Sequence, residues 1–289
     1  MRGLVVGSLC IAVATAAASL PLRMVVDGAG RRVIVPRRPA RIVSMAPSVT
    51  EMLFALGGGD RVVGVTDFCD YPPEATARTH IGGMINPDLE RIVSLAPDLV
   101  VASTSGNYRD AIEKIEALGI PAYTIDTPSV ERILETLGTL GDLLDTSDTA
   151  GRLVARLRAR LRSVRAAADG TARPRTLFVL ESDPLIAAGP GTFLGEALEI
   201  AGAELATTAS RSRWAQYDLE QVIRMKPEVI LTTAANREWS RRILSADRWR
   251  GVPAVATGRV FVVSDAIQHP GPRLVDGIEE IARILKASP

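Results

Sequence analysis

The chain has little of what most metal centres and disulfide frameworks need. Its 289 residues contain two cysteines and two histidines. Cys10 lies in an apolar N-terminal stretch that we expect to be removed, which leaves Cys69 alone and allows no internal disulfide in the mature protein. With only His80 and His269 beside it, no multi-histidine or paired-cysteine metal site can be assembled. We therefore expect no dedicated metal site and a stability that comes from a packed core.

Strong charge and the common catalytic motifs are also missing. The net charge is +1, without long runs of like charge, which argues against a nucleic-acid surface. The sequence has no phosphate-binding glycine loop, nucleophile elbow or zinc-protease helix motif. Asp67, Asp70 and Glu74 fall close together, but carboxylates without a partner histidine more often cap or face solvent than catalyse. The sequence thus predicts a protein that is not an enzyme and has no intrinsic cofactor.

The N-terminus is typical of a cleavable secretory signal. Arg2 precedes the apolar stretch Leu4–Ala18, which is too short to span a membrane and ends in small residues. We expect residues 1–18 to be a signal peptide, cleaved near Ala18 during export. A lipid anchor on Cys10 is not expected, because Leu9 stands where a lipoprotein signal has a small residue.

One stretch of the chain occurs twice. Residues 89–101 return in similar form as residues 219–231 at a constant offset of 130, so that the acidic residue, the proline and the apolar positions of the strand recur in register. In each copy an acidic residue, Glu90 or Glu220, opens an amphipathic helix, a proline ends it, and an aliphatic run typical of a buried parallel strand follows. One such unit in each half predicts two similar α/β lobes with a ligand site between them.

The remaining patterns give the expected layout. Residues 19–38 form an N-terminal extension with a hairpin, 39–145 the N-terminal lobe, 146–170 an interlobe helix and 171–289 the C-terminal lobe. Each lobe should be a small, mostly parallel sheet flanked by helices, and one long rigid helix should join them. That helix has an apolar stripe, and its many arginines are better explained as a solvated face than as a membrane or nucleic-acid surface; the stripe is Leu153, Leu157, Leu161 and Val164.

Two helix starts can be assigned from capping residues. Ser48 or Thr50 is expected to cap a helix that runs to Leu56 and ends at a glycine run. Asn86 and Pro87 are expected to supply the N-cap and first turn of the first repeated helix.

Aromatic residues make up only 4% of the chain, so their positions are informative. Phe54, Phe178 and Phe261 fall within helix or strand patterns and are expected in the core. A second group falls in expected loops at strand ends, where open α/β sheets bind ligands; it comprises Phe68, Tyr108, Phe193, Trp214 and Tyr217. Each alone could equally pack on its own loop, but together they favour a site for a large, flat or apolar ligand.

Several motifs resemble one family. From about Arg41 to Leu285 the chain is similar to the periplasmic-binding proteins that feed cobalamin, ferric-siderophore and haem ABC importers. The resemblance implies two lobes joined by a rigid helix, little closure on binding, and a monomeric receptor that delivers its ligand to a membrane permease dimer. The motifs that carry it are Asp70–Ala75, Asn86–Ile92, Gly189–Phe193, Leu219–Glu220 and Pro270–Val275.

The resemblance also implies roles for individual residues. Asp70–Ala75 is most similar to the cobalamin branch, in which Phe68, Trp214 and Asp265 match ligand contacts. Glu90 and Glu220 match two acidic residues that dock onto permease arginines. Met84 and Ser103 stand where that branch can have tryptophan, so a ferric siderophore or haem is the alternative, with Tyr108 or His269 as an axial ligand. The expected ligand residues are Phe68, Met84, Ser103, Tyr108, Phe193, Trp214, Asp265 and His269.

The sequence therefore predicts an extracytoplasmic receptor of an ABC importer that captures a corrinoid between its lobes. The second expectation within the same family is a receptor for a ferric siderophore or haem. A periplasmic enzyme or a metal chaperone on the same scaffold is the remaining alternative.

Overall fold

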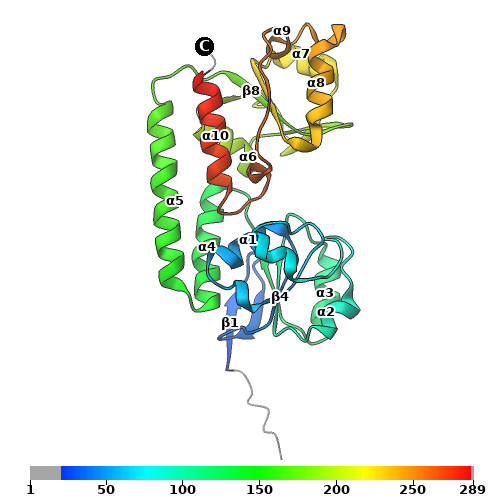
Figure 1. Cartoon of the computed structure of the whole chain (residues 1–289), viewed down its shortest axis with the longest axis vertical. Helices are drawn as coiled ribbons and strands as arrows, with labels where there is room; N and C mark the ends of the chain where they lie inside the picture. The colour runs from blue at the N-terminus through cyan, green and yellow to red at the C-terminus, as the bar shows by residue number, and fades with distance from the viewer. Residues whose placement is uncertain (1–20, 288–289) are drawn as a thin grey trace, which may run out of the picture.

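A computed structural model of the chain describes residues 21–287. Two α/β lobes lie one above the other, and long helices run along one side of both (Figure 1). The expected signal peptide and Cys10 lie outside the described residues. Between residues 21 and 287, no helix combines the length and the apolar character needed to cross a bilayer.

The chain begins with a hairpin that is attached to the N-terminal lobe. Strands β1 (Leu22–Val26) and β2 (Arg32–Pro36) pair antiparallel, as the sequence predicted. In the turn, the backbone N–H of Gly28 donates to the carbonyl of Thr124 at 2.6 Å. A Cβ atom at Gly28 would lie only 2.4 Å from the backbone nitrogen of Asp126, so glycine permits this close approach. The buried Val33 and Val35 join the core below, so the extension is part of the lobe's packing.

The N-terminal lobe is built on a five-stranded, all-parallel sheet in the order β5-β4-β3-β6-β7. Its first helix starts differently from the expected capping. Ala46 is the N-cap and Pro47 occupies the first turn, where its missing N–H costs nothing, so Ser48 and Thr50 lie inside the helix. The elements are β3 (Ile42–Ser44), α1 (Pro47–Ala55), β4 (Val62–Val65), β5 (Thr79–His80), α2 (Leu89–Ser94), β6 (Leu99–Ser103), α3 (Arg109–Ala117) and β7 (Ala122–Ile125).

The C-terminal lobe has a six-stranded sheet that mixes directions. Strands β10, β8, β12 and β13 are parallel, while β9 and β11 add an antiparallel edge. Both lobes are thus mostly parallel sheets flanked by helices, as predicted. The elements are β8 (Arg175–Ser182), β9 (Leu185–Ala188), α6 (Phe193–Ile200), β10 (Glu204–Leu205), β11 (Trp214–Gln216), α7 (Leu219–Met225), β12 (Val229–Thr232), α8 (Arg237–Ser245), α9 (Pro253–Ala256), β13 (Val260–Val262) and α10 (Leu274–Ala287).

The repeated stretch folds alike in both lobes, as α2 followed by β6 and α7 followed by β12. The N-cap of α2 is Asp88, not Asn86, and its carboxylate accepts from the N–H of Arg91. Asp218 caps α7 in the same way, at the same offset of 130 residues. The residue before each helix-ending proline, Ala96 or Lys226, has a positive φ of 44° or 48°. The duplication therefore extends to the caps and the backbone turn.

Three helices connect the lobes. Helix α4 (Val130–Leu144) and α5 (Ser147–Ala168) pack on each other, and the last helix, α10, returns to pack on α5. The predicted apolar stripe of α5 is confirmed as its buried face. One of its arginines, Arg160, is not simply solvated, because it pairs with both Asp276 and Glu279 of α10.

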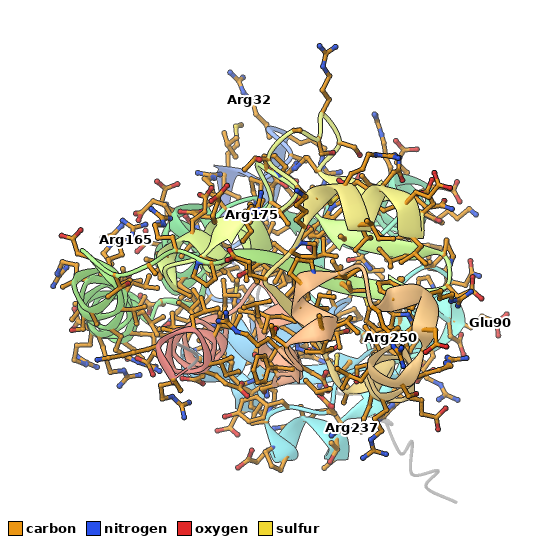
Figure 2. The ribbon with its side chains drawn as sticks, turned by 90° about the horizontal axis from the view of Figure 1, so that it is seen from above. Arg32, Glu90, Arg165, Arg175, Arg237 and Arg250 are labelled. Carbon is orange, nitrogen blue, oxygen red and sulfur yellow. The ribbon has the colours of Figure 1, made fainter. Side chains whose placement is uncertain are left out.

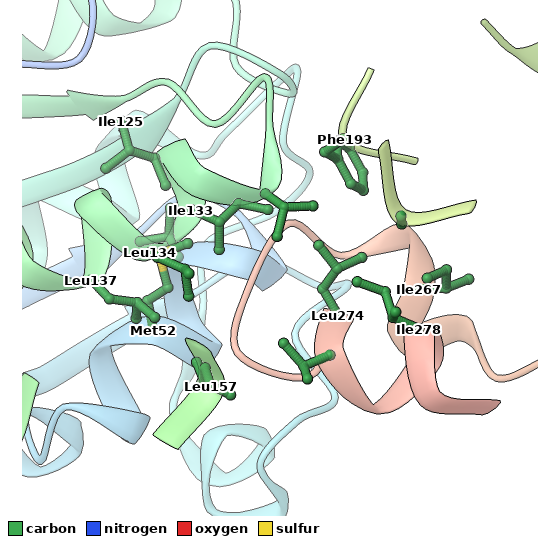
Figure 3. Packing of buried hydrophobic residues seen from close by; sticks show 14 of the residues in the cluster. Met52, Ile125, Ile133, Leu134, Leu137, Leu157, Phe193, Ile267, Leu274 and Ile278 are labelled. Atoms are coloured by element: carbon green, nitrogen blue, oxygen red, sulfur yellow. The ribbon is translucent and has the colours of Figure 1, made fainter. Parts of the chain in front are cut away.

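A single hydrophobic core runs through this connection (Figure 3). Met52 of α1 and Leu137 of α4 belong to the same buried cluster as Leu274 and Ile278 of α10 and Phe178 of β8. Because the core is continuous from one lobe to the other, rotating the lobes apart would expose apolar surface to water.

The interlobe core yields a stability prediction. Leu274→Ala should lower the free energy of unfolding by about 2–5 kcal/mol, because it removes a buried side chain and leaves a cavity. Leu274 is 1% exposed, whereas Leu118, at the end of α3, is 54% exposed. Leu118→Ala is therefore the control and should change stability by less than about 0.5 kcal/mol. Urea unfolding of both variants tests this, and equal losses would contradict a shared interlobe core.

Candidate functional site

In the N-terminal lobe, one asparagine ties together the segments that follow the parallel strands. The Nδ2 of Asn107 donates to the carbonyls of Met45 and Met84, both at 2.9 Å. Its Oδ1 accepts from the N–H of Ser103 at 2.8 Å. Asn107 thus joins the ends of β3 and β6 to the segment after β5, and ligands of open α/β sheets bind at such strand ends.

Two aromatic rings stand exposed on these segments. Phe68, after β4, and Tyr108, the N-cap of α3, are each 61% exposed. Large aromatic side chains normally gain from burial, so their exposure leaves contact area free for a ligand. Met84 packs closely against Gly106. A Cβ atom placed on Gly106 would lie only 2.0 Å from the Cε atom of Met84. Ser103 is buried, and its hydroxyl accepts from the N–H of Ser105.

In the C-terminal lobe, Trp214 is the exposed aromatic ring. It opens the edge strand β11, is 41% exposed, and packs edge-to-face on Phe193 with ring centroids 6.3 Å apart. Phe193 itself is buried at the start of α6. Close backbone contact fixes this arrangement, because the N–H of Gly189 donates to the carbonyl of Arg213 at 2.8 Å.

The segments that follow β12 and β13 are joined by polar contacts. Asp265 is exposed, and its Oδ1 accepts from the N–H of Ala234 at 3.2 Å. Gln268 Nε2 donates to Thr233 Oγ1 at 3.0 Å. These contacts hold the short helical turn Asp265–Gln268 against the neighbouring strand end.

A buried carboxylate connects this turn to the other lobe. Glu51 of α1 has a side chain 2% exposed. Its oxygens accept from Arg273 Nε at 2.9 Å and Nη2 at 2.6 Å, and His269 Nδ1 lies 2.8 Å from Oε1. Tyr71 covers the Arg273 guanidinium, with the ring centroid 3.8 Å from Cζ. Since α1 follows β3 and His269 follows β13, the ends of these two strands face each other across the lobes.

The environment of Glu51 keeps it ionised. Burial by itself raises the pKa of this carboxyl group, but hydrogen bonds from Arg273 and His269 outweigh burial and lower the pKa below its ordinary value of 4.5. The cluster is therefore a charged, fully hydrogen-bonded link between the lobes. A buried charge is tolerated only with such partners.

The structure places the expected ligand residues in two groups. Phe68, Met84 and Tyr108 of one lobe, and Trp214 and Asp265 of the other, lie on strand-end or edge segments with exposed or partly exposed side chains. Ser103 and Phe193 are buried, and His269 contacts Glu51 of the other lobe.

Two of the aromatic residues expected in loops lie in regular elements instead: Phe193 begins helix α6 and Trp214 begins strand β11. Tyr217 follows β11 in a loop, as expected, and is half-buried against the C-terminal core.

Sequence reasoning missed Glu51 and Asn107. A lone acid within the apolar helix segment 47–55 was the available signal for Glu51, since a buried acid requires a basic partner. Arg273, in the Pro270–Val275 motif, is that partner. Asn107 carried no comparable pattern.

The repeated acids lie on the outside. Glu90 and Glu220 occupy the first turns of α2 and α7 and are exposed. Glu90 projects freely from the molecular surface in Figure 2. Glu220 forms an ion pair with Arg224 of the same helix at 3.8 Å, and no other ion pair of Glu220 occurs within residues 21–287. Acids at these positions are favoured by the helix dipole and remain available to a partner.

Other chemistry is sparse in the part of the chain that the structure describes. Residues 21–287 contain no cluster of three or more metal-ligating side chains. Cys69 is a buried free thiol, with Sγ 3.1 Å from both Thr50 and Thr66 Oγ1, and burial raises its pKa. A hollow of about 600 Å³ lies between α5 and α10, on elements that carry none of the expected ligand residues.

Comparison with known proteins gives the same family in sequence and in structure. A family model described as periplasmic binding protein matches residues 42–266. One relative is the uncharacterized ABC transporter substrate-binding lipoprotein YvrC of Bacillus subtilis (strain 168). It is 31% identical over 264 residues, an alignment that covers 89% of this chain and 83% of the relative. A vitamin B12-binding protein of Vibrio parahaemolyticus is 30% identical over 247 residues, covering 83% and 87%.

Two solved structures share the whole architecture. The periplasmic vitamin B12 binding protein BtuF of Vibrio cholerae superposes with a TM-score of 0.75 at 26% identity, over 87% of this chain and 98% of that one. The periplasmic heme-binding protein RhuT from Roseiflexus sp. RS-1 gives a TM-score of 0.77 at 27% identity, over 86% and 98%.

The Glu51 cluster yields a prediction about stability. Arg273→Ala should lower the free energy of unfolding by about 3–5 kcal/mol, because it leaves a buried carboxylate short of its main partner. The matched control is Arg250→Ala, since the Arg250–Asp247 pair is exposed on both sides and such pairs contribute about 0–1 kcal/mol. Denaturant unfolding at neutral pH compares the two, and similar losses would contradict the structural role of the cluster.

The same cluster should be visible in the pH dependence. The pKa of Glu51 is lower in the folded than in the unfolded protein, so its contribution to stability is complete above its ordinary value of 4.5 and is lost as the pH falls through the folded value. Unfolding measured from neutral to acidic pH should show a smaller acid loss for Glu51→Gln than for the wild type. Identical slopes would remove Glu51 from the acid response.

Proposed function

We propose that this chain, which belongs to the periplasmic binding protein family, is the solute receptor of an ABC importer and captures cobalamin or a related corrinoid between its lobes. The observation that carries the proposal is the exposure of aromatic rings on both lobes. Phe68 and Tyr108 on one lobe and Trp214 on the other are 41–61% exposed, although most large apolar side chains within residues 21–287 are buried. A flat, largely apolar ligand would bury them.

A corrinoid is the favoured ligand because of the relatives. The vitamin B12-binding protein of Vibrio parahaemolyticus aligns over most of this chain, and the Vibrio cholerae structure has the same fold. Phe68, Trp214 and Asp265 would contact the ligand, Met84 would add an apolar surface, and Phe193 would support Trp214 from behind. Ser103 and Asn107 would fix the strand ends on which these residues lie.

Haem or a ferric siderophore is the second candidate, supported by the similarity to RhuT. Tyr108, which is 61% exposed, would supply a phenol oxygen to an iron atom. His269 is less suited to that role, because its Nδ1 faces Glu51. We assign His269 to the interlobe link.

Delivery of the ligand would use the repeated acids. Glu90 and Glu220 are exposed at equivalent helix ends in the two lobes, so they can present one charge each to the two halves of a permease dimer. Charge pairs at such a rim govern the association rate and the register more than the affinity.

The proposal also covers the oligomeric state, location and processing of the protein. The protein would act as a monomer in the periplasm, would catalyse no reaction and would hold no cofactor of its own. Residues 1–18 would be removed as a signal peptide, without a lipid anchor on Cys10, in contrast to the relative named as a lipoprotein. The mass of the secreted protein distinguishes these two fates.

The ligand site can be tested at Trp214. Trp214→Ala should weaken binding by about 1–3 kcal/mol, since an aromatic platform and its buried area are lost. Calorimetric titration with cyanocobalamin, haemin and a ferric siderophore identifies the ligand of the wild type and the effect of the variant. Leu244→Ala, an exposed apolar residue of α8, is the control and should bind normally. Unchanged affinity of the Trp214 variant would remove this residue from the site.

The docking role can be tested by charge reversal. Glu90→Lys combined with Glu220→Lys should leave ligand affinity intact but abolish permease binding and uptake, with single variants intermediate. The matched control, Asp110→Lys with Glu238→Lys, makes the same charge change at exposed first-turn acids of α3 and α8. Binding to the cognate permease at low and high salt gives the measurement. Normal docking of the first pair, or equal loss in both, would contradict the proposal.

A further inference from the structure

The N-terminal hairpin exposes an apolar surface that nothing in the ligand or docking sites uses. Leu22, Met24, Val26 and Ile34 are 58%, 64%, 61% and 56% exposed, and together they form what we call the hairpin face. Isolated exposed aliphatic residues are ordinary, but four adjacent ones on one surface indicate an interaction site.

The strand pairing makes this surface continuous. Side chains of β1 alternate, so Leu22, Met24 and Val26 point to the same side, and Met24 lies directly opposite Ile34 of β2. Val33 and Val35 point the other way and are buried in the core. One side of the hairpin therefore packs into the core. The hairpin face, on the other side, contributes no contacts to that core.

The segment that forms the hairpin is rich in arginine. Residues 21–41 contain six arginines and one acid, Asp27, whereas the whole chain has a net charge of only +1. Arg31 pairs with the buried Asp27 and with Glu116, and Arg38 pairs with Asp145. Arg32 and Arg37 are exposed and form no ion pair within residues 21–287. Arg32 projects away from the body of the molecule in Figure 2.

We propose that the hairpin face is a membrane-contact surface that adsorbs to bilayers containing anionic lipids. Aliphatic side chains flanked by arginines suit the boundary between headgroups and acyl chains, where apolar burial and attraction to anionic headgroups act together.

This surface is separate from the docking acids. Arg32 of the hairpin and Glu90 of α2 point in different directions in Figure 2. Adsorption through the hairpin face therefore leaves Glu90 accessible, and it would keep the receptor near the membrane without using its ligand or permease contacts. The inference depends on an extracytoplasmic location but on no particular ligand.

Vesicle sedimentation of the mature protein, residues 19–289, tests the proposal. Binding to vesicles of phosphatidylcholine with phosphatidylglycerol should be about tenfold or more stronger than to phosphatidylcholine alone, and should fall as salt is raised. Met24→Glu combined with Ile34→Glu should reduce binding to the anionic vesicles by about tenfold or more. Arg32→Glu should reduce it less and should weaken the salt dependence.

Leu118→Glu is the matched control, because it places the same charge at an exposed aliphatic residue outside the hairpin face. It should bind vesicles like the wild type. Because all the substituted side chains are exposed, every variant should have the melting temperature of the wild type. Equal vesicle binding by the wild type and the Met24/Ile34 variant would overturn the proposal. So would equal binding to neutral vesicles, or a concentration-dependent dimer that the same variant abolishes, which would assign the face to a second copy of the chain.

Discussion

The relative position of the two lobes is set by the apolar packing of α10 with the helices α1, α4 and α5. The sheets do not share strands, so their relative position depends on helix packing, and one buried cluster reaches from Met52 through Leu137 to Leu274. Packed interiors resist deformation because loss of contact exposes apolar surface. Glu51 also fixes the orientation of α1 relative to α10, because its two carboxylate oxygens pair with the planar guanidinium of Arg273 in one geometry. A receptor built this way presents its site largely preformed, which limits the entropy lost on binding.

Local features of this fold could be predicted from the sequence. The repeated helix and strand, the hairpin and the apolar stripe of α5 depend on residues that are close in the chain, so periodicity and turn residues revealed them. The capping errors at Ser48 and Asn86 arose where a neighbouring residue had the better geometry: Pro47 in one case and Asp88 in the other. Contacts such as Glu51 with His269 join residues 218 positions apart. No local pattern records such a pairing, so the sequence gives no sign that His269 contacts an acid of the other lobe.

The candidate site was only partly predictable for a related reason. Scarcity made the aromatic residues conspicuous, but whether a ring lines a surface or supports another ring depends on tertiary packing. Phe193 and Trp214 illustrate this: both are aromatic and both were expected in loops, yet one is buried behind the other. Asn107, which joins three chain segments with one side chain, has no sequence signature, since asparagine is also a favoured residue of ordinary turns.

The duplication constrains some surfaces and leaves others free. Helices α2 and α7 share caps, acids and the backbone turn before proline, so the two lobes present equivalent helix ends. The exposed aromatic residues come instead from segments that differ between the lobes: parallel strand ends carry Phe68 and Tyr108, whereas the antiparallel edge of β9 and β11, absent from the N-terminal sheet, carries Trp214. In the proposed function, a permease with two equivalent halves would dock on the first kind of surface and an asymmetric ligand would bind the second. Ligand contacts could then change without altering the docking surface; the relatives named for vitamin B12 and for heme share this one fold.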